Sequence, residues 1–495
     1  MSEDRRKQHG AYYTPDGTVR SLVNWAVRRS TDRALDPSSG DGRFLTLHKR
    51  SVGVEQDSEA AAVARARAPW ALVHEGEFFG WAASTKERFE CAIGNPPFIR
   101  YQRFSGEVRQ RALTLCESHG ATFSALSSSW APFLVAAASL LKPGGRMAFV
   151  VPAEIGHAPY ARPLLEYLFR NFGDIRLLAV RQKIFSDLSE DAWLLYADQF
   201  GARTNDLLLT KQESFSFLPE PPTHGVRVSL QEWRTANYRL RPFLMESTAR
   251  ELYARTLNDP ATRRLGAMAQ VGIGYVTGAN EFFHLRPSQV ERIGVPRSLL
   301  QPTVRNGRAL IGDAVTDATV KEWYRRDDPV LLLRLSADVE VPTGVRRYLD
   351  SLEGREARSS YKCRNRSPWY VVPDVVIPDA FLSYMSGEGP ALVANRATCA
   401  CTNSVHAVRL AGGVSLRGLQ AAWAHPFTGL SCEIEGHPLG GGMLKIEPRE
   451  AQRIAIADHS RWNCDEIRII KEALGTLQSW RHYGGHQEAT TDLWA

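Results

Sequence analysis

The sequence predicts an α/β domain followed by a second domain of different construction. Apolar strands alternate with helical segments up to about residue 200, a pattern typical of helices wound around a largely parallel sheet. Beyond that point the alternation fades, and at 495 residues the chain is too long for one compact lobe. We therefore expect a sheet domain over residues 1–200, a linker over 201–245, which contains Pro-Glu-Pro-Pro at 219–222, and a second domain over 246–495.

The first predicted element is a loop followed by a helix. Residues 10–15 are Gly-Ala-Tyr-Tyr-Thr-Pro, and the segment behind them places Val19, Leu22, Val23 and Ala26 on one helical face. Taken alone, this element predicts no more than a loop before an amphipathic helix.

A strand, a glycine turn and the start of a helix follow over residues 35–45, Leu-Asp-Pro-Ser-Ser-Gly-Asp-Gly-Arg-Phe-Leu. Gly40 and Gly42 allow the backbone to approach a nucleotide-like ligand closely, and the helix N-terminus adds a favourable dipole. Asp36 and Asp41 stand where the pyrophosphate of a dinucleotide would lie, which disfavours a dinucleotide dehydrogenase. A cationic sulfonium ligand fits these two acids better.

The next two strands also end in acids. The strand within residues 51–57 ends at Glu55, about twenty residues after the first turn, where a carboxylate takes the two ribose hydroxyls of a bound nucleotide. The strand within residues 71–79 places Glu77 at its carboxyl end. A carboxylate there can accept a hydrogen bond from an adenine amino group.

The fourth strand carries the motif with the most chemical content. Residues 92–98 are Ala-Ile-Gly-Asn-Pro-Pro-Phe, and this ending suits transfer of a group to an amino group on a planar ring. Such a nitrogen is a poor nucleophile, because its lone pair is delocalised. The Asn95 side-chain oxygen and the Pro96 carbonyl can each accept one amino hydrogen, Pro97 stiffens the loop, and Phe98 can stack on the base. The alternative is a strand that ends in an ordinary Pro-Pro turn.

Three more strands complete a set of seven. A buried helix over 130–141 and a Lys-Pro-Gly-Gly-Arg break at 142–146 precede a strand over 146–152, and two further strands are expected over 175–181 and 192–200. The break leaves neither half near twenty apolar residues. We therefore expect no membrane span here.

Taken in this order, the motifs resemble those of the gamma class of adenine-N6 DNA methyltransferases, S-adenosyl-L-methionine-dependent enzymes of Type II restriction-modification systems. In that class a Tyr-x-Thr-Pro element, here Tyr12, Thr14 and Pro15, precedes the motif Asp-Pro-x-x-Gly-x-Gly, two acidic motifs and the motif Asn-Pro-Pro-Tyr/Phe. The third motif usually carries Asp where this chain has Glu77, and the fourth usually ends in Tyr where this chain has Phe98.

The resemblance covers the motifs of roughly the first 200 residues. It implies a class I methyltransferase domain, Rossmann-like and seven-stranded, with a C-terminal α+β target-recognition domain. By the same resemblance, Asp36 lies near the amino acid portion of the cofactor, and the Thr14-Pro15 loop closes over its methionine end. The expected cofactor-binding residues are Tyr12, Tyr13, Thr14, Pro15, Asp36, Pro37, Ser38, Gly40, Gly42, Glu55 and Glu77.

The loop between the last two strands, residues 182–187, contains Phe185. By resemblance this aromatic stacks on the target adenine after the base is rotated out of the duplex, with Phe98 on the other side. The alternative is a phenylalanine of the ordinary core. The expected catalytic residues are Asn95, Pro96, Pro97, Phe98 and Phe185, without a metal or a cysteine nucleophile.

The second domain is expected to bind double-stranded DNA. The chain has 61 basic and 54 acidic residues, and most of the cations are arginine. The planar guanidinium of arginine can donate two hydrogen bonds at once to a guanine edge or a phosphate, which lysine cannot. The densest basic stretch lies within 346–366 and precedes Trp369-Tyr370. The alternative is a solvated charged face, in which case the glycine-rich stretch 271–278 is the next candidate. The expected DNA-binding residues are Lys362, Arg364, Arg366 and Trp369.

Several other classes of protein are disfavoured. The seven cysteines are scattered, with Cys399-Ala-Cys401 as the closest pair, and the N-terminus lacks an apolar signal segment, so we expect a cytoplasmic protein with reduced thiols. None of the ten lysines has an acid two positions earlier, as a common nuclease metal site requires, and nine residues precede Gly10. We therefore expect a monomeric, stand-alone methyltransferase whose cognate restriction endonuclease, where one exists, is encoded separately.

Two alternatives from other classes stay open. An RNA or protein amide methyltransferase can use the same motif, because guanine amines and glutamine amides pose the same chemical problem. The large second domain and Phe185 argue against it. A DNA-binding protein with an inactive methyltransferase fold is the non-enzymatic alternative, and Gly40, Gly42 and Asn95 argue against that.

Overall fold

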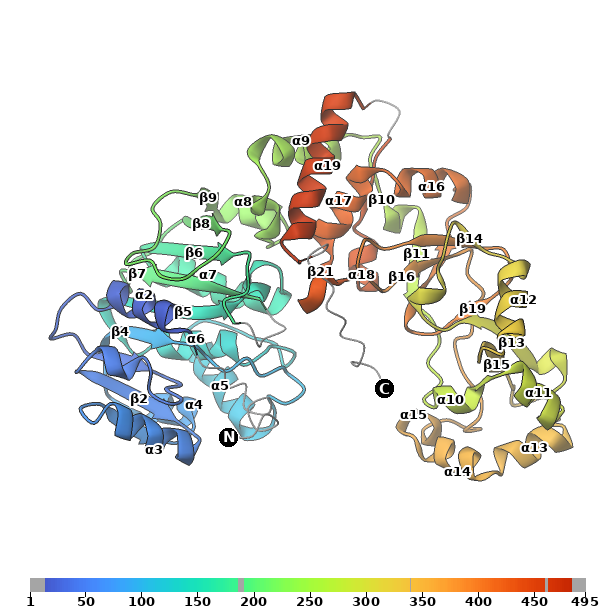
Figure 1. The fold of residues 1–495 in the computed structure, drawn as a ribbon, viewed down its shortest axis with the longest axis horizontal. Coiled ribbons are helices and arrows are strands. Elements are labelled where there is room, and N and C mark those ends of the chain that lie inside the picture. The colour runs from blue at the N-terminus through green and yellow to red at the C-terminus, as the bar shows by residue number, and fades with distance from the viewer. Residues whose placement is uncertain (1–13, 186–190, 339, 459–461, 483–495) are drawn as a thin grey trace. The chain divides into compact units, whose positions relative to one another are not determined.

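The computed structural model describes residues 14–185, 191–338, 340–458 and 462–482. The chain divides into two compact units, Met1–Met245 and Glu246–Ala495, which Figure 1 shows in colours that run along the chain. Tyr12 and Tyr13, two of the expected cofactor contacts, lie outside the described residues.

Among the described residues, the first unit contains a nine-stranded sheet in the order β3-β2-β1-β4-β5-β7-β6-β8-β9. The strands from β3 to β5 are parallel, while β7 runs antiparallel between β5 and β6. The sheet confirms the predicted α/β class. The strands are β1 (Ala34–Asp36), β2 (Ser51–Glu55), β3 (Leu72–Glu75), β4 (Phe89–Gly94), β5 (Leu141–Pro152), β6 (Asp174–Val180), β7 (Ala192–Asp198), β8 (Asp206–Gln212) and β9 (Val226–Ser229).

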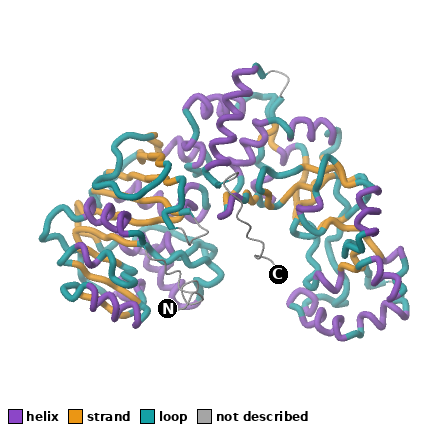
Figure 2. The backbone as a smooth tube through the Cα atoms, viewed as in Figure 1, coloured by secondary structure: helices purple, strands orange, loops and turns teal. Residues whose placement is uncertain are grey.

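Helices pack along this sheet, as Figure 2 shows. The amphipathic helix α2 (Asp16–Ala26) buries Val19, Leu22 and Val23 in a core cluster with Cys91 and Ile93 of β4. Alternate residues of a strand point to opposite faces, so Ala92 between these two points to the other face of the sheet. The remaining helices of the unit are α3 (Ser58–Arg67), α4 (Phe78–Ser84), α5 (Gly106–Ser118), α6 (Trp130–Ala138), α7 (Arg162–Asn171) and α8 (Leu230–Thr235).

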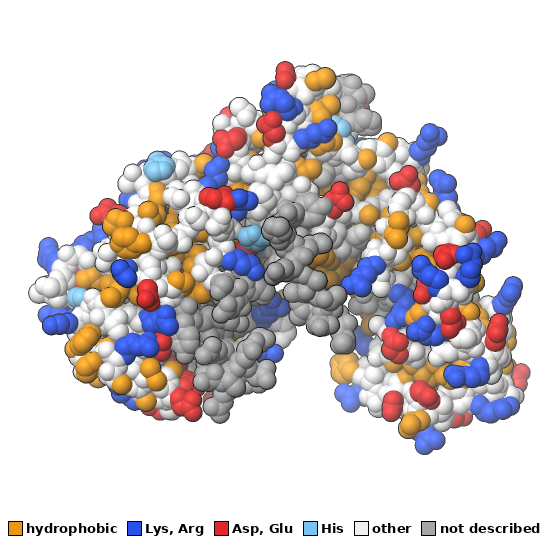
Figure 3. Space-filling model, viewed as in Figure 1, with side chains coloured by type: hydrophobic (Ala, Val, Ile, Leu, Met, Phe, Trp, Pro, Cys, Tyr) orange, Lys and Arg blue, Asp and Glu red, His pale blue; other side chains and the backbone are white. Residues whose placement is uncertain are grey.

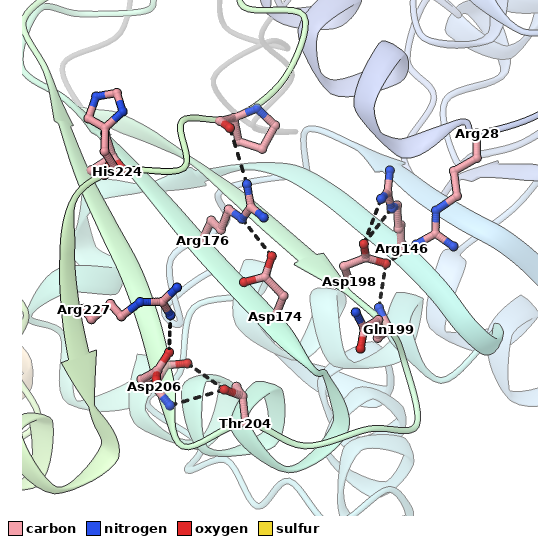
Figure 4. Close-up of polar contacts among 12 residues, drawn as sticks. Arg28, Arg146, Asp174, Arg176, Asp198, Gln199, Thr204, Asp206, His224 and Arg227 are labelled. Carbon is pink, nitrogen blue, oxygen red and sulfur yellow. Dashed lines mark hydrogen bonds and ion pairs between the residues drawn. The ribbon is translucent and has the colours of Figure 1, made fainter.

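The expected seven strands are all present, and two more extend the sheet from within residues 201–245, the stretch expected to be a linker with some local structure. Strand β8 pairs in parallel with β6, and β9 pairs antiparallel with β8. The extension is held by an ion pair between Arg227 and Asp206 at 2.9 Å, and Arg176 of β6 donates to the Pro221 carbonyl at 3.5 Å (Figure 4). The physical reason is the buried run Leu207–Leu209, which fits a sheet and not a solvated linker.

The second unit mixes short strands with helices. Its described residues form a five-stranded sheet, β11-β20-β16-β18-β14, a four-stranded sheet, β12-β15-β13-β19, and two smaller sheets. The strands are β10 (Arg263–Arg264), β11 (Ala269–Ile273), β12 (His284–Leu285), β13 (Leu300–Val304), β14 (Ala314–Val315), β15 (Leu331–Leu333), β16 (Ala380–Ser383), β17 (Met385–Ser386), β18 (Leu392–Asn395), β19 (Ala400–Cys401), β20 (Val405–Leu410), β21 (His437–Pro438), β22 (Leu444–Lys445) and β23 (Ala455–Ile456).

The helices of the second unit cover these sheets and include three consecutive short helices, α13 to α15, over the basic stretch. They are α9 (Ser247–Leu257), α10 (Asn280–Phe283), α11 (Pro287–Ile293), α12 (Asp317–Arg325), α13 (Thr343–Leu349), α14 (Leu352–Ser359), α15 (Tyr361–Arg364), α16 (Leu416–Trp423), α17 (Pro426–Glu435), α18 (Pro448–Ala451) and α19 (Cys464–Ser479). The unit is therefore α+β in construction, as predicted.

In the described parts of the chain, no helix is both long enough and apolar enough to cross a membrane, and no three His, Cys, Asp or Glu side chains are grouped to hold a metal ion. All seven cysteines are free thiols, and all but Cys464 are buried.

Candidate active site

A cavity of about 520 Å³ lies at the carboxyl ends of the first four strands, within the size range of small-molecule sites. Residues at or just after the end of each of these strands line the cavity. The carboxyl ends of the strands are the expected place for a ligand in an open α/β sheet. Of the predicted residues, those that line it are Thr14, Pro37, Ser38, Gly40, Glu55, Glu77, Asn95 and Pro97. Those that do not line it, among the described residues, are Pro15, Asp36, Gly42, Pro96, Phe98 and Phe185.

The glycine turn after β1 has two different roles. Gly40 has φ of 52° with open space around it, and its N–H donates to the Glu55 carboxylate at 2.8 Å. Gly42 has φ of 83°, and a Cβ there would lie 2.8 Å from the Cα of Ala64 in α3. Gly40 thus faces the cavity, whereas Gly42 permits close packing of the turn on a helix.

Glu55 is held firmly at the end of β2. Its second carboxylate oxygen accepts from the Asp57 N–H at 2.8 Å, and Asp57 caps α3 by accepting from the Ala60 N–H at 2.9 Å. Each carboxylate oxygen of Glu55 can still accept a further hydrogen bond. The geometry therefore suits a pair of ligand hydroxyls.

Glu77 performs a structural task as well. Its carboxylate caps α4 by accepting from the N–H groups of Phe79 at 2.6 Å and Gly80 at 2.8 Å, and Arg111 lies 3.2 Å away. A ligand amino group would share this carboxylate with those donors.

Beside Glu77 the cavity has an apolar wall that local motifs did not reveal. Its aromatic residues come from three separate segments, so only packing brings them together. They are Phe78, Phe79, Phe104 and Phe133. Such a wall suits a planar ring.

Asp41 is paired with two arginines and does not offer the cavity an unpaired carboxylate. Arg43 lies 3.2 Å and Arg67 2.5 Å from the same Asp41 carboxylate oxygen, and both arginines line the cavity. The argument for a cationic ligand therefore shifts to Asp36.

Asp36 directly precedes the lining residues Pro37 and Ser38 in the chain and is 2% exposed. One carboxylate oxygen accepts from the Ser38 N–H at 3.2 Å, and the other has no hydrogen-bond partner among the described residues. Burial, with smaller contributions from the nearby Glu55 and Asp41, raises the pKa of Asp36 from 3.8 to about 8. A buried carboxyl with an unused oxygen fits a site that receives a cation.

The Asn-Pro-Pro-Phe loop borders the same cavity. Asn95 and Pro97 line it, with the buried Pro96 between them. Phe98 is half-buried and packs against the core cluster that contains Phe185, which is 6% exposed. The structure thus brings the two rings to one cluster, but it places Phe185 where the alternative of a core phenylalanine also fits.

In the second unit the four predicted DNA contacts separate into two kinds. Lys362 and Arg364 are exposed, and the Arg364 guanidinium lies 5.4 Å from the ring of Tyr361, which is 68% exposed. Arg366 instead donates to the carbonyls of Val276 at 2.6 Å and Thr277 at 2.5 Å.

Trp369 also serves the fold. It is partly buried in a core cluster, with its ring 5.7 Å from that of Phe282. Arg366 joins the basic stretch to the glycine-rich stretch 271–278, so the two candidate recognition segments contact each other. Arg366 and Trp369 thus each make a contact within the second unit, and their role at the DNA stays a prediction.

Comparison with known proteins agrees with both units. Residues 52–185 match the Eco57I restriction-modification methylase family, and residues 238–481 match the C-terminal domain of Type II methyltransferase M.Eco57I. Type II methyltransferase M.XamI of Xanthomonas campestris pv. amaranthicola is 24% identical over 483 residues, which cover 91% of this chain and 86% of that protein. Type II methyltransferase M.AccI of Acinetobacter calcoaceticus is 19% identical, with 92% and 87% covered.

Among solved structures, the Type IIL restriction-modification enzyme MmeI in complex with DNA has a TM-score of 0.57 and 11% identity. The match covers 98% of this chain and 78% of that one. At this identity the likeness concerns the fold alone.

Proposed function

We propose that this chain, which belongs to the Type II methyltransferases of restriction-modification systems, methylates the N6 amino group of adenine in double-stranded DNA. The observation that carries the proposal is the shared cavity: Asn95, the predicted acceptor of the amine, lines the same space as Glu55 and Glu77. A nucleoside-like cofactor and a planar amine can therefore meet there.

The residues of the cavity fit S-adenosyl-L-methionine, which supplies a methyl group on a cationic sulfur. Glu55 would accept from the ribose hydroxyls, and the aromatic wall would flank the adenine ring. Asp36 would lie close to the positive charges, since it directly precedes Pro37 and Ser38 of the cavity lining and has a buried, unused oxygen. Thr14, which is buried and lines the cavity, and Pro15 beside it would cover the methionine end.

On the substrate side, the Asn95 side-chain oxygen and the Pro96 carbonyl would each accept one hydrogen of the amine. This pulls the nitrogen toward a tetrahedral shape and directs its lone pair at the methyl carbon. The new nitrogen–carbon bond forms as the carbon–sulfur bond breaks, and the nitrogen then releases one proton to solvent. Much of the rate would come from positioning. Phe98 and Phe185 are the proposed stacking partners of the flipped base.

Contact with the duplex is proposed for the exposed turn of α15, with Tyr361, Lys362 and Arg364. Figure 3 shows Lys and Arg side chains interspersed with Asp and Glu over the visible surface of the second unit, without one continuous basic stripe. Local clusters such as this turn would then supply phosphate contacts. We also propose that the protein acts as a cytoplasmic monomer beside a separately encoded endonuclease.

The test is expression of the parent and of Asn95→Ala in a host that lacks DNA methylation. Mass spectrometry of the digested DNA should show N6-methyladenine from the parent and almost none from the variant, while S-adenosylmethionine binding stays within a few-fold. Modification-sensitive long-read sequencing would then give the site. Methylcytosine in the DNA, or labelled methyl only in RNA or protein, would overturn the proposal. A parent that fails to bind the cofactor would favour an inactive fold.

A further inference from the structure

Three consecutive carbonyl groups in the catalytic loop have different partners. The Asn95 carbonyl accepts from the Ser38 hydroxyl at 3.0 Å. The Pro97 carbonyl accepts from the Ser129 hydroxyl at 2.6 Å and from the Ile99 N–H at 3.0 Å. Between them, the Pro96 carbonyl accepts no hydrogen bond from any residue that the structure describes.

Ser129 makes most of the contacts on one side of this loop. Its hydroxyl donates to the Pro97 carbonyl and accepts from the Ile99 N–H at 3.1 Å, and its own N–H donates to the Ile99 carbonyl at 3.0 Å. Pro96 and Pro97 have no N–H group, so they cannot anchor the loop through backbone donors of their own. The hydrogen bonds that fix these two prolines therefore have to come from donors elsewhere in the fold.

Ser129 is itself held in buried structure. Ser129 is 2% exposed and precedes α6, in which every residue is buried. Ser38 approaches the loop from the other side, on the glycine turn after β1. The loop is thus held between the turn that borders the cofactor cavity and a core helix.

We infer that Ser129, together with Ser38, is a positioning residue that holds the two outer carbonyls so that the Pro96 carbonyl stays available for the substrate amine. This inference rests on the proposed function, in which Pro96 accepts one amino hydrogen. A displacement of about 1 Å at such an acceptor can cost about a hundredfold in rate. Loss of the Ser129 hydroxyl should therefore act on catalysis more than on binding.

The neighbouring residues provide a matched control. Ser127 and Ser129 are both buried in the same short segment, but the Ser127 hydroxyl has no hydrogen-bond partner among the described residues. Ser127→Ala removes the same atoms as Ser129→Ala without touching the catalytic loop. The variant Ser129→Thr keeps a hydroxyl, and Ser129→Cys keeps the size but is a weak donor.

The experiment compares kcat, KM for DNA, the Kd of S-adenosylhomocysteine and thermal unfolding for the full chain and these variants. We expect Ser129→Ala to lower kcat about 10- to 100-fold, with KM and Kd within about threefold, Ser127→Ala to match the parent, and Ser129→Thr to recover part of kcat. If Ser129 had only a structural role, Ser129→Ala would lower the melting temperature, and kcat measured below that temperature would equal that of the parent.

Equal kcat for Ser129→Ala and Ser127→Ala would overturn the inference. Should Ser129→Ala fail to fold, Ser129→Cys decides, because unchanged kcat in that variant would also overturn it. A parent that methylates no DNA is a different outcome, since it refutes the proposed function and not the positioning of the loop.

Discussion

The buried carboxyl of Asp36 should make cofactor binding depend on pH. Its pKa is raised to about 8 by burial, so the empty protein carries it protonated at neutral pH. A cationic ligand is bound best by the ionised form, and each pH unit below the pKa then weakens binding about tenfold. Affinity for S-adenosylmethionine should therefore rise as the pH rises toward 8.

The size of the effect follows from the ionised fraction. With a pKa of about 8, roughly 1% of Asp36 is ionised at pH 6 and roughly a quarter at pH 7.5, so the Kd should fall about 20-fold between these values. The ligand's own amino group, with a pKa of about 7.7 to 8, stays largely protonated over this range. The Asp36→Asn variant should bind more weakly at pH 7.5 and show a nearly flat profile.

Titration calorimetry at several pH values, for the parent and Asp36→Asn, measures these slopes. Parallel slopes in the two proteins would refute the argument, because the titrating group would then lie elsewhere.

The free energy of unfolding gives a second check, in which stability falls with rising pH while cofactor affinity rises. A pKa raised above its ordinary value of 3.8 means that the empty parent loses stability as the pH rises from about 4 to 8. Asp36→Asn should therefore gain most over the parent near pH 8.

Four further outcomes are expected. Replacing Lys362 and Arg364 by alanine should lower the slope of log affinity for duplex against log salt by roughly two units and leave the unfolding free energy unchanged. Fluorescence anisotropy in a salt series measures this slope. An unchanged slope would mean that α15 is an ordinary charged surface that does not contact DNA. Arg366→Ala should cost about 1–3 kcal/mol in denaturant unfolding, because two backbone carbonyls lose a charged donor; parent-like stability would contradict that role. Phe185→Leu should stay within about 1.5 kcal/mol of the parent in stability but lose methyl transfer in a labelled-methyl assay, whereas full activity would leave it a core residue only. Purified protein with magnesium should methylate DNA without cutting it, and site-specific fragments on a gel would contradict a lone methyltransferase.

The sequence by itself determined the α/β class, the strand that ends at Glu55 and the strand that leads into Asn95, because these features are local. Apolar runs of strand length, glycine in a left-handed turn and the fixed φ of proline depend on neighbours along the chain. The cavity duly forms where the first four strands end.

Only the tertiary structure decided which side chains serve those motifs. Ser129 contacts a loop that lies more than thirty positions earlier, Arg67 forms an ion pair with Asp41, and Arg366 donates to the carbonyls of a segment about ninety positions away. None of these partners follows from spacing, because an arginine or serine can bond to any acceptor that packing brings within reach. Residues 201–245 show the same limit in the backbone. Their proline-rich stretch predicts a linker, yet this segment contains two strands, because β8 finds backbone hydrogen-bond partners in β6 and β9 finds them in β8.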